Sequence, residues 1–394
     1  MYPVIILHKG REDSVMRRHP WIFSGAIARK EGDLSVGDLV AVADFKGKTL
    51  GYGLYEEGSL QVRMIGFGEQ TPDEAFWGEK LLSAYHLRKS LGLTDNPQTN
   101  TYRLIHAEGD GFPGLVADYY NGVLVLQAQT PGMYRLLPQI THLLPGVLGN
   151  KLQAVYSKPA EYATRFDSAL RDSQGLLWGE MDEIEILENG HRFKVDIVLG
   201  QKTGFFLDQR ENRWLVAQYA AGRRVLNCYS YSGGFSVYAL KAGATLVHSV
   251  DSSRKAIEAC RSNLVLNGFD PETHVCIEAD AMEFLARMDN DYDLLILDPP
   301  AFAKHLNQKS KALKAYRYIN RLALSKARPG SFLFTFSCSQ VVDTESFRST
   351  VLSAAIEVGR DVKILHVLRQ PPDHPVNIFQ PESEYLKGLM VYIA

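Results

Sequence analysis

The motif Asp298-Pro299-Pro300 carries the sharpest chemical signal in the sequence. It follows the apolar run 294–297, so a carboxylate closes a predicted strand, and two prolines without N–H groups stiffen the turn after it. A rigidly held carboxylate or carbonyl suits hydrogen bonding to the polar edge of a nucleobase. The alternative is structural, a strand that simply ends at prolines. We predict a catalytic role for Asp298 and a substrate site formed by Pro299, Pro300, Phe302, which could stack on the base, and Lys304.

A cysteine closes the next predicted strand, since Cys338 follows the run 331–337 and lies forty residues after Asp298. In a doubly wound sheet the ends of the fourth and fifth strands adjoin, so we expect Cys338 beside Asp298. A thiolate is the natural nucleophile for an electron-poor pyrimidine carbon. Attack at C6 makes C5 nucleophilic, C5 takes a methyl group, and a base then removes the C5 proton. The alternative role for a cysteine in a strand is that of a small buried apolar residue, which we expect for Cys228, Cys260 and Cys276.

The turn after the predicted strand 223–228 has the pattern of a nucleoside cofactor site. Small residues between a strand and a helix let a ligand approach the backbone and the helix N-terminus. The next strand ends in Asp251, seventeen residues after Gly234, where a carboxylate can accept both ribose hydroxyls. Asp280 ends the third strand and can accept from an adenine amino group. The predicted contacts in the turn are Asn227, Ser232, Gly233, Gly234 and Phe235.

The identity of this cofactor follows from a missing motif. No strict G-x-G-x-x-G is present, and a pyrophosphate needs that close backbone cradle. S-adenosylmethionine has no phosphate, so the pattern favours it over NAD. Each carboxylate alone could instead be a helix N-cap, and the glycine pair a plain turn, but Asp251, Asp280 and Asp298 close three successive strands.

Residues 186–394 contain the elements that must position these side chains. Short apolar strands alternate with helices, which is the signature of a doubly wound α/β sheet. Strands are predicted to begin near residues 225, 246, 275, 294, 331, 363 and 387, with the last two joined as an antiparallel hairpin after the proline-rich loop 370–381. In the helix after the second strand we expect Ser252 as the N-cap and Gly268 as the left-handed C-terminal residue.

The first 185 residues are predicted to form two further modules. Residues 1–70 have short strands, such as 39–42 and 60–65, between glycine turns, which fits a small β-barrel. Residues 71–185 combine a helical pattern over 73–91 with strands at 123–126 and 154–156, which indicates an α+β module.

Composition limits the class of protein. With 394 residues, 45% hydrophobic and 22% charged, the chain is expected to fold as two or three globular domains. It has no apolar stretch of 18 residues and no signal-peptide pattern. Four cysteines without metal-ligand spacing indicate free thiols in a reducing, cytoplasmic protein, and Asp373 beside His374 is too little for a metal site.

Charge argues against a globally basic nucleic-acid binder, because the formal net charge is −2. A local basic patch nevertheless lies between residues 9 and 30, where only Glu12 and Asp13 oppose six Lys and Arg side chains. It is either a solvated face or an RNA-binding surface, for which Arg17 and Arg18 are the predicted contacts.

Taken together, these motifs resemble the ribosomal RNA large-subunit methyltransferase I family over essentially the whole chain. Residues 19–25 and 37–40 are similar to its N-terminal PUA domain, and residues 108–115 to the signature of its central region. The catalytic domain is matched by residues 204–210, Asn227 with 232–236, 298–300, 337–339, 373–375 and 381–388.

The resemblance implies an enzyme that forms 5-methylcytosine in 23S rRNA with S-adenosylmethionine. It implies a PUA-like RNA-binding domain at residues 1–70, a central linker domain at 71–185 and a class I methyltransferase domain with a seven-stranded sheet at 186–394. It further implies a Cys338 nucleophile, cofactor contacts from Asp251, Asp280 and Asp298, and a cofactor-adjacent segment that includes Gln209 and Arg210.

Several alternatives stay open. A fifth-strand cysteine also resembles the 5-methyluridine RNA enzymes, so the target base is not decided by the motif. Glu382 is the candidate for the proton-abstracting base, because a carboxylate in the loop between the last strands can reach the site; it could equally be a surface residue. The competing functions are an exocyclic-amine methyltransferase, a non-catalytic RNA-binding assembly factor and, more distantly, an NAD oxidoreductase. A homodimer is one option for the oligomeric state.

Overall fold

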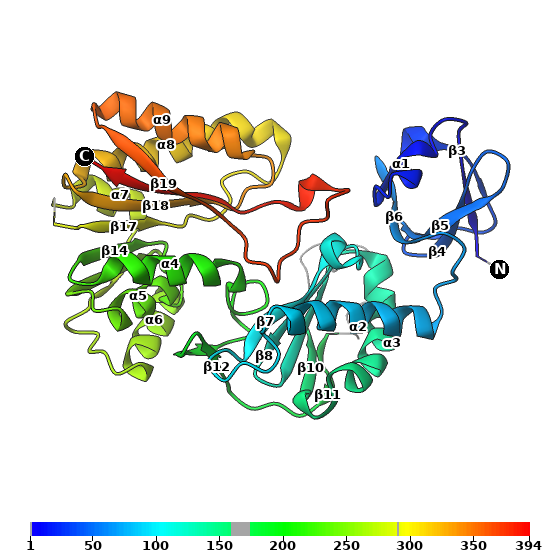
Figure 1. The fold of residues 1–394 in the computed structure, drawn as a ribbon, viewed down its shortest axis with the longest axis horizontal. Coiled ribbons are helices and arrows are strands. Elements are labelled where there is room, and N and C mark those ends of the chain that lie inside the picture. The colour runs from blue at the N-terminus through cyan, green and yellow to red at the C-terminus, as the bar shows by residue number, and fades with distance from the viewer. Residues whose placement is uncertain (1, 159–173, 290) are drawn as a thin grey trace. The chain divides into compact units, whose positions relative to one another are not determined.

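The computed structural model describes residues 2–158, 174–289 and 291–394 (Figure 1). The chain divides into two compact units. Unit 1 contains Met1–Ile186, Val195–Phe205 and Pro372–Ser383, and unit 2 contains Leu187–Lys194, Phe206–Pro371 and Glu384–Ala394. The predicted domain boundaries near 70 and 185 stay predictions.

A six-stranded sheet forms the N-terminal part of unit 1, within the described residues, in the order β2-β6-β5-β4-β1-β3. Its core consists of alternate side chains such as Ile5, Val40, Val42 and Val62, which are fully buried. This period-two burial explains the predicted strands, because one face of each strand is apolar. The elements are β1 (Val4–Leu7), α1 (Asp13–Met16), β2 (Trp21–Phe23), β3 (Ile27–Glu31), β4 (Leu39–Ala43), β5 (Thr49–Tyr55) and β6 (Leu60–Phe67).

The rest of unit 1 is built on a second sheet, which has five strands in the described part of the chain, in the order β11-β10-β9-β8-β7. The predicted helix over 73–91 is confirmed as α2 (Glu74–Ser90), capped by the Asp73 carboxylate, which accepts from Phe76 N. The sequence reading did not identify α3 (Pro131–Leu148), although Thr130 caps it and Pro131 occupies its first position. The strands are β7 (Thr101–His106), β8 (Leu115–Tyr120), β9 (Val123–Ala128), β10 (Ala154–Ser157) and β11 (Gly175–Gly179).

Unit 2 is a doubly wound sheet, as predicted, with seven strands among the described residues in the order β16-β15-β14-β17-β18-β20-β19. The first five strands are parallel, and β20 lies antiparallel between β18 and β19. The predicted terminal hairpin is therefore confirmed. The strands are β14 (Arg224–Cys228), β15 (Leu246–Asp251), β16 (Cys276–Glu278), β17 (Leu294–Leu297), β18 (Ser331–Ser337), β19 (Val362–Arg369) and β20 (Lys387–Ile393).

Helices cover both faces of this sheet, with α4, α5 and α6 on one face and α8 and α9 on the other (Figure 1). The helices are α4 (Arg210–Ala220), α5 (Gly234–Lys241), α6 (Arg254–Leu266), α7 (Ala281–Arg287), α8 (Lys309–Lys326) and α9 (Thr344–Val358). A short hairpin of β12 (Ile184–Glu188) and β13 (His191–Val195) precedes α4. Among the described residues, no helix is long and apolar enough to cross a membrane.

One predicted helix cap was wrong. Ser253, not Ser252, is the N-cap of α6, because its Oγ accepts from Ala256 N at 3.4 Å, three residues later. Gly268 has a φ of 82°, which confirms the predicted left-handed residue after this helix.

Candidate active site

The turn after β14 has an unusual backbone. Tyr229 and Tyr231 have positive φ angles of 61° and 46°, and Gly233 follows with 80°. Left-handed conformations cost a residue with a side chain about 1–2 kcal/mol, and such strain collects at ligand sites. Two contacts to the neighbouring strand β15 hold the turn: Ser230 N donates to Val250 O at 3.0 Å, and Tyr231 N donates to Asp251 Oδ2 at 3.0 Å.

Two glycines of this turn have little room for a side chain. A Cβ on Gly233 would lie 2.5 Å from the Cys260 Sγ of α6, and one on Gly234 would lie 3.0 Å from the Arg213 side chain of α4. Both glycines therefore allow close packing of two helices behind the turn. This contact places Arg213 of α4 against the predicted cofactor turn, and the nearness of the segment 209–213 to a cofactor stays a prediction.

A buried ion pair supports the same turn. Arg213 donates from Nε and Nη2 to the two Glu188 carboxylate oxygens, each at 2.8 Å, and from Nη1 to Phe206 O at 3.0 Å. Both side chains are almost fully buried. The neighbouring carboxylate raises the pKa of Arg213 against the opposing effect of burial, so Arg213 stays charged.

The three predicted carboxylates lie at the carboxyl ends of their strands. Asp251 accepts from Tyr231 N and from Ser253 N at 2.9 Å. Asp280 is exposed and caps α7, with one oxygen accepting from both Met282 N and Glu283 N at 2.9 Å. The N-cap alternative therefore holds for Asp280, and its role toward a ligand stays a prediction.

Two buried polar atoms at the end of β14 have no hydrogen-bond partner within the described residues, Asn227 Oδ1 and Ser230 Oγ. Asn227 has no exposed surface, and its Nδ2 donates to Ser236 Oγ at 2.9 Å, so it lies under the turn rather than open to a ligand. Ser232 and Phe235 are also buried. The unpaired Ser230 Oγ and the carboxylates around a turn without a phosphate cradle fit a polar nucleoside cofactor of the predicted kind.

Asp298 is held by a glutamine of the segment before α4. Gln209 Nε2 donates to Asp298 Oδ1 at 2.9 Å, and Gln209 Oε1 accepts from Asn212 Nδ2 at 2.6 Å. Gln209 and Arg210 are both buried. The structure thus brings Gln209 to the carboxylate of the Asp-Pro-Pro motif.

Cys338 lies beside this motif, as the adjacent ends of β17 and β18 predict. Its Sγ is 3.9 Å from Pro299 O, and the residue is partly exposed, whereas Cys228, Cys260 and Cys276 are buried. Burial raises the pKa of the Cys228 thiol above its usual range, which disfavours its thiolate form.

The other predicted substrate residues lie around the same turn. Pro300 and Lys304 are exposed. The Phe302 ring is partly buried and packs on Tyr316 with a centroid distance of 4.7 Å. Its stacking on a base stays a prediction.

Lys387, in β20, was missed by the sequence reading. Its Nζ donates to Ser339 O at 2.8 Å, one residue after Cys338, and the side chain is only 4% exposed. Burial lowers the pKa of Lys387 to about 8, and the nearby Cys338 acts in the opposite direction. The signal that could have found it is a lysine at the first position of an otherwise apolar strand.

Three predicted residues belong to unit 1. Glu382 is exposed in the short 3-10 helix η8 (Pro381–Ser383), and its role as a base stays a prediction. Arg17 and Arg18 are exposed directly after α1. In the described part of the chain, no group of three or more His, Cys, Asp and Glu side chains could hold a metal ion.

Comparisons with known proteins define the class. The sequence profile of an S-adenosylmethionine-dependent methyltransferase family matches residues 102–378, and that of a PUA-like domain matches residues 5–67. The fold and the turn after β14 agree with that class. The protein is an S-adenosylmethionine-dependent methyltransferase with an N-terminal PUA-like domain, and S-adenosylmethionine is its cofactor.

The family follows from full-length relatives. Ribosomal RNA large subunit methyltransferase I of Klebsiella pneumoniae is 38% identical over 395 residues, which cover 98% of each chain. The enzyme of that name from Erwinia tasmaniensis is 39% identical with the same coverage. The chain belongs to the ribosomal RNA large subunit methyltransferase I family.

Solved structures agree on the fold. A protein from Streptococcus mutans, provisionally described as a SAM-dependent methyltransferase, has a TM-score of 0.83 at 21% identity, with 99% and 100% of the two chains covered. A second structure, of a protein crystallised with SAH, has a TM-score of 0.84 at 21% identity, with the same coverage.

Proposed function

We propose that this protein methylates C5 of a cytosine in large-subunit ribosomal RNA, with Cys338 as the nucleophile. One observation carries the proposal: the partly exposed Cys338 Sγ lies 3.9 Å from Pro299 O, at the sheet edge that also carries the cofactor turn. The substrate class is supported by the relatives, which are named as ribosomal RNA large subunit methyltransferases, and by the PUA-like domain.

The cofactor supplies an electrophilic methyl group on a sulfonium sulfur. In our proposal Asp251 accepts hydrogen bonds from its ribose hydroxyls and Asp280 from its adenine amino group. The backbone of Gly233 and Gly234 allows its close approach. Asp251 suits this role because it already fixes the turn through Tyr231 N and retains acceptor capacity.

The chain's own groups then act on the base. The Cys338 thiolate adds to C6, which breaks the C5=C6 π bond and gives C5 the electron pair that forms the new bond to the methyl carbon. The bond from that carbon to the sulfonium sulfur breaks at the same time, and its electron pair stays on the sulfur. A base takes the C5 proton, the C5=C6 bond re-forms, and the thiolate leaves from C6. Glu382 is our candidate for the base.

Asp298 is proposed to accept from the polar edge of the flipped cytosine, held in place by Gln209. Because the attack comes from the face of the ring, the base must leave its stack, and the substrate is then a loop or an opened segment of rRNA. Phe302 and Lys304 are the proposed contacts to the base and its flanking phosphate.

The test is a transfer assay with radiolabelled S-adenosylmethionine and unmodified large-subunit rRNA, followed by nucleoside analysis. Wild type should yield 5-methylcytosine, Cys338→Ala should yield none, and the matched variant Cys276→Ala should remain active because that thiol is buried away from the motif. RNA that contains 5-fluorocytidine has no C5 proton to remove, so it should trap a covalent adduct with wild type only. Full activity of Cys338→Ala, or a methyl group on uridine C5 or on an exocyclic nitrogen, would overturn the proposal.

A further inference from the structure

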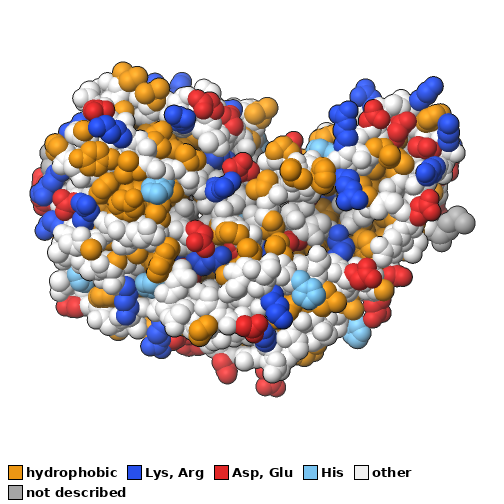
Figure 2. Space-filling model, viewed as in Figure 1, with side chains coloured by type: hydrophobic (Ala, Val, Ile, Leu, Met, Phe, Trp, Pro, Cys, Tyr) orange, Lys and Arg blue, Asp and Glu red, His pale blue; other side chains and the backbone are white. Residues whose placement is uncertain are grey.

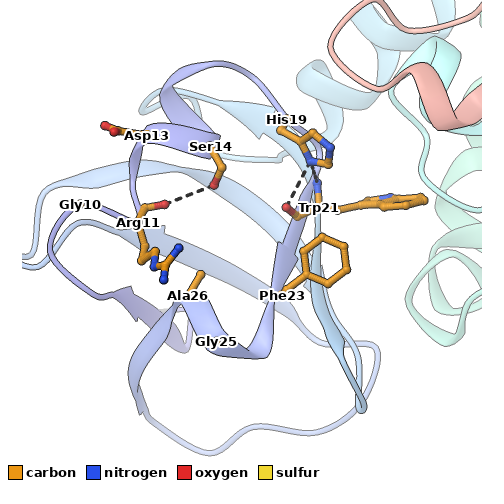
Figure 3. A pocket seen from close by; sticks show the side chains of 9 residues that line it. All are labelled: Gly10, Arg11, Asp13, Ser14, His19, Trp21, Phe23, Gly25 and Ala26. Carbon is orange, nitrogen blue, oxygen red and sulfur yellow. Dashed lines mark hydrogen bonds between the residues drawn. The ribbon is translucent and has the colours of Figure 1, made fainter.

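A hollow on the N-terminal sheet is not used by the proposed chemistry. Its volume is about 460 Å³, within the ~300–1,000 Å³ range of ligand sites. Figure 3 shows it between the segment around α1 and strand β2. Its lining consists of Gly10, Arg11, Asp13, Ser14, His19, Trp21, Phe23, Gly25 and Ala26.

Aromatic side chains on one short strand line one side of this hollow. Phe23 is 48% exposed and meets Trp21 edge to face, with ring centroids 6.4 Å apart. Trp21 is fixed, because its Nε1 donates to Glu108 Oε1 at 3.0 Å and its N donates to His19 Nδ1 at 3.1 Å. An exposed aromatic ring on a rigid neighbour is a preorganised stacking platform.

Arg11 lines the hollow, and Arg17 and Arg18 directly follow α1, which borders it. Arg11, Arg17 and Arg18 are exposed, and within the described residues none of them forms an ion pair. Figure 2 shows several Lys and Arg side chains over the N-terminal part of unit 1, with Asp and Glu side chains among them. In Figure 3 the Arg11 side chain extends toward Ala26, whereas the Asp13 carboxylate points away from the aromatic rings. Positive charge beside an exposed ring complements a phosphate attached to a stacked base.

We propose that this hollow binds one unstacked nucleobase of single-stranded RNA, with Phe23 as the stacking surface and Arg11 as the contact to the adjacent phosphate. The proposal rests on the proposed RNA substrate. It adds a base-binding site in the PUA-like domain that is separate from the site of methyl transfer. A protein partner, whose interface would also favour exposed aromatic and arginine side chains, is an outcome of the test: it predicts that Phe23→Ala leaves the RNA affinity unchanged.

The test measures binding without catalysis. A fluorescein-labelled unstructured 12-nucleotide RNA is titrated with the full-length protein, and with a matched oligonucleotide whose central nucleotides are abasic. Phe23→Ala should weaken binding of the normal RNA by roughly 5- to 100-fold, the loss of one stacked base, and should have little effect on the abasic RNA. Arg11→Ala should reduce the dependence of log affinity on log salt by about one unit with both RNAs.

Met16→Ala is the matched control, because Met16 is 68% exposed on α1 and lies outside the lining. Equal affinity of wild type and Phe23→Ala, or an equal loss for the abasic RNA, would overturn the base-binding site. Cys338→Ala is expected to bind like wild type. Because Cys338→Ala removes the proposed nucleophile and leaves the hollow unchanged, RNA affinity tests the base-binding site independently of methyl transfer.

A different observation supports a second inference, at the buried lysine of β20. We infer that Lys387 is a positioning residue that stabilises the thiolate of Cys338. Its Nζ contacts Ser339 O at 2.8 Å, and in the β18–β20 register it pairs with Ser337, so it lies against the two residues that flank the cysteine. A fixed positive charge beside a thiol favours the thiolate.

Ionisable groups face Lys387 from each element packed against it. Cys338 after β18, Glu384 before β20 and Asp343 at α9 all favour its charged form. In β19 the residue that pairs with Lys387 is Arg369, whose positive charge disfavours the charged form of Lys387. These three partners oppose the effect of burial, which remains the larger influence on the pKa of Lys387.

The test follows the rate of Cys338 alkylation by iodoacetamide against pH, by peptide mass spectrometry. Cys228, Cys260 and Cys276 are buried and serve as internal controls. Lys387→Gln should shift the pH midpoint of alkylation upward. Lys387→Arg keeps the positive charge, so its midpoint should lie near that of wild type. An unchanged midpoint in folded Lys387→Gln, which is what a purely structural role predicts, would overturn the inference. An upward shift in Lys387→Arg as large as that in Lys387→Gln would also overturn it, whatever the outcome for methyl transfer.

Discussion

Replacement of Gly233 by alanine tests the argument that close packing shapes the cofactor turn. Gly233 has a φ of 80°, so alanine there costs about 1–2 kcal/mol from the left-handed backbone alone. The new Cβ would also lie 2.5 Å from Cys260 Sγ, and overpacking of this kind costs about 1–3 kcal/mol. We expect Gly233→Ala to lower the free energy of unfolding by about 2–5 kcal/mol.

Gly243 provides the matched control. It has a φ of 91°, but a Cβ there has no heavy atom within 4 Å, so Gly243→Ala carries only the backbone cost of about 1–2 kcal/mol. The double variant Gly233→Ala/Cys260→Ala removes the sulfur from the contact. We expect it to show a coupling energy of about 1–3 kcal/mol in a double-mutant cycle, since the two residues touch.

The assay is urea unfolding, with hydrogen exchange of the β14–α5 amides as a local readout and calorimetric titration of S-adenosylhomocysteine as the functional one. Gly233→Ala should weaken ligand affinity, and Gly243→Ala should leave it unchanged. The reasoning is refuted if both glycine variants lose equal stability, or if the coupling energy is below about 0.5 kcal/mol.

Three further predictions concern other contacts and one buried lysine. Glu188→Gln leaves Arg213 as a buried charge without a full partner and should cost about 3–5 kcal/mol in urea unfolding; a loss below about 1 kcal/mol would contradict this. Gln209→Leu removes the donor to Asp298 and should slow methyl transfer by roughly 10- to 100-fold in single-turnover assays, the value of a hydrogen bond to a charged group; an unchanged rate would contradict it. Burial lowers the pKa of Lys80 to about 8 from 10.5, so the unfolded chain binds more protons between these values, and stability from this group rises as pH increases through that window. Lys80→Met should lack this rise in unfolding experiments from pH 8 to 10.5, and an identical pH dependence would exclude the assignment.

The sequence by itself determined the elements that carry the candidate site. The alternation of apolar strands and helices is a local pattern, and a parallel sheet brings the carboxyl ends of its strands to one edge. Asp251, Asp298 and Cys338 could therefore be placed at that edge without a structure. The antiparallel hairpin at the end of the chain was also predictable, because its connection has no helical pattern.

Only the tertiary structure decided which side chains support these residues. Gln209 meets Asp298 across 89 residues of sequence, and Lys387 meets Ser339 across 48. No periodicity encodes such contacts, because they depend on how helices and antiparallel strands pack against the sheet. The hollow around Phe23 has the same origin, since a strand pattern gives the exposure of alternate residues but not the space between two elements. The local sequence thus determined where chemistry can occur, and packing decided how its groups are held.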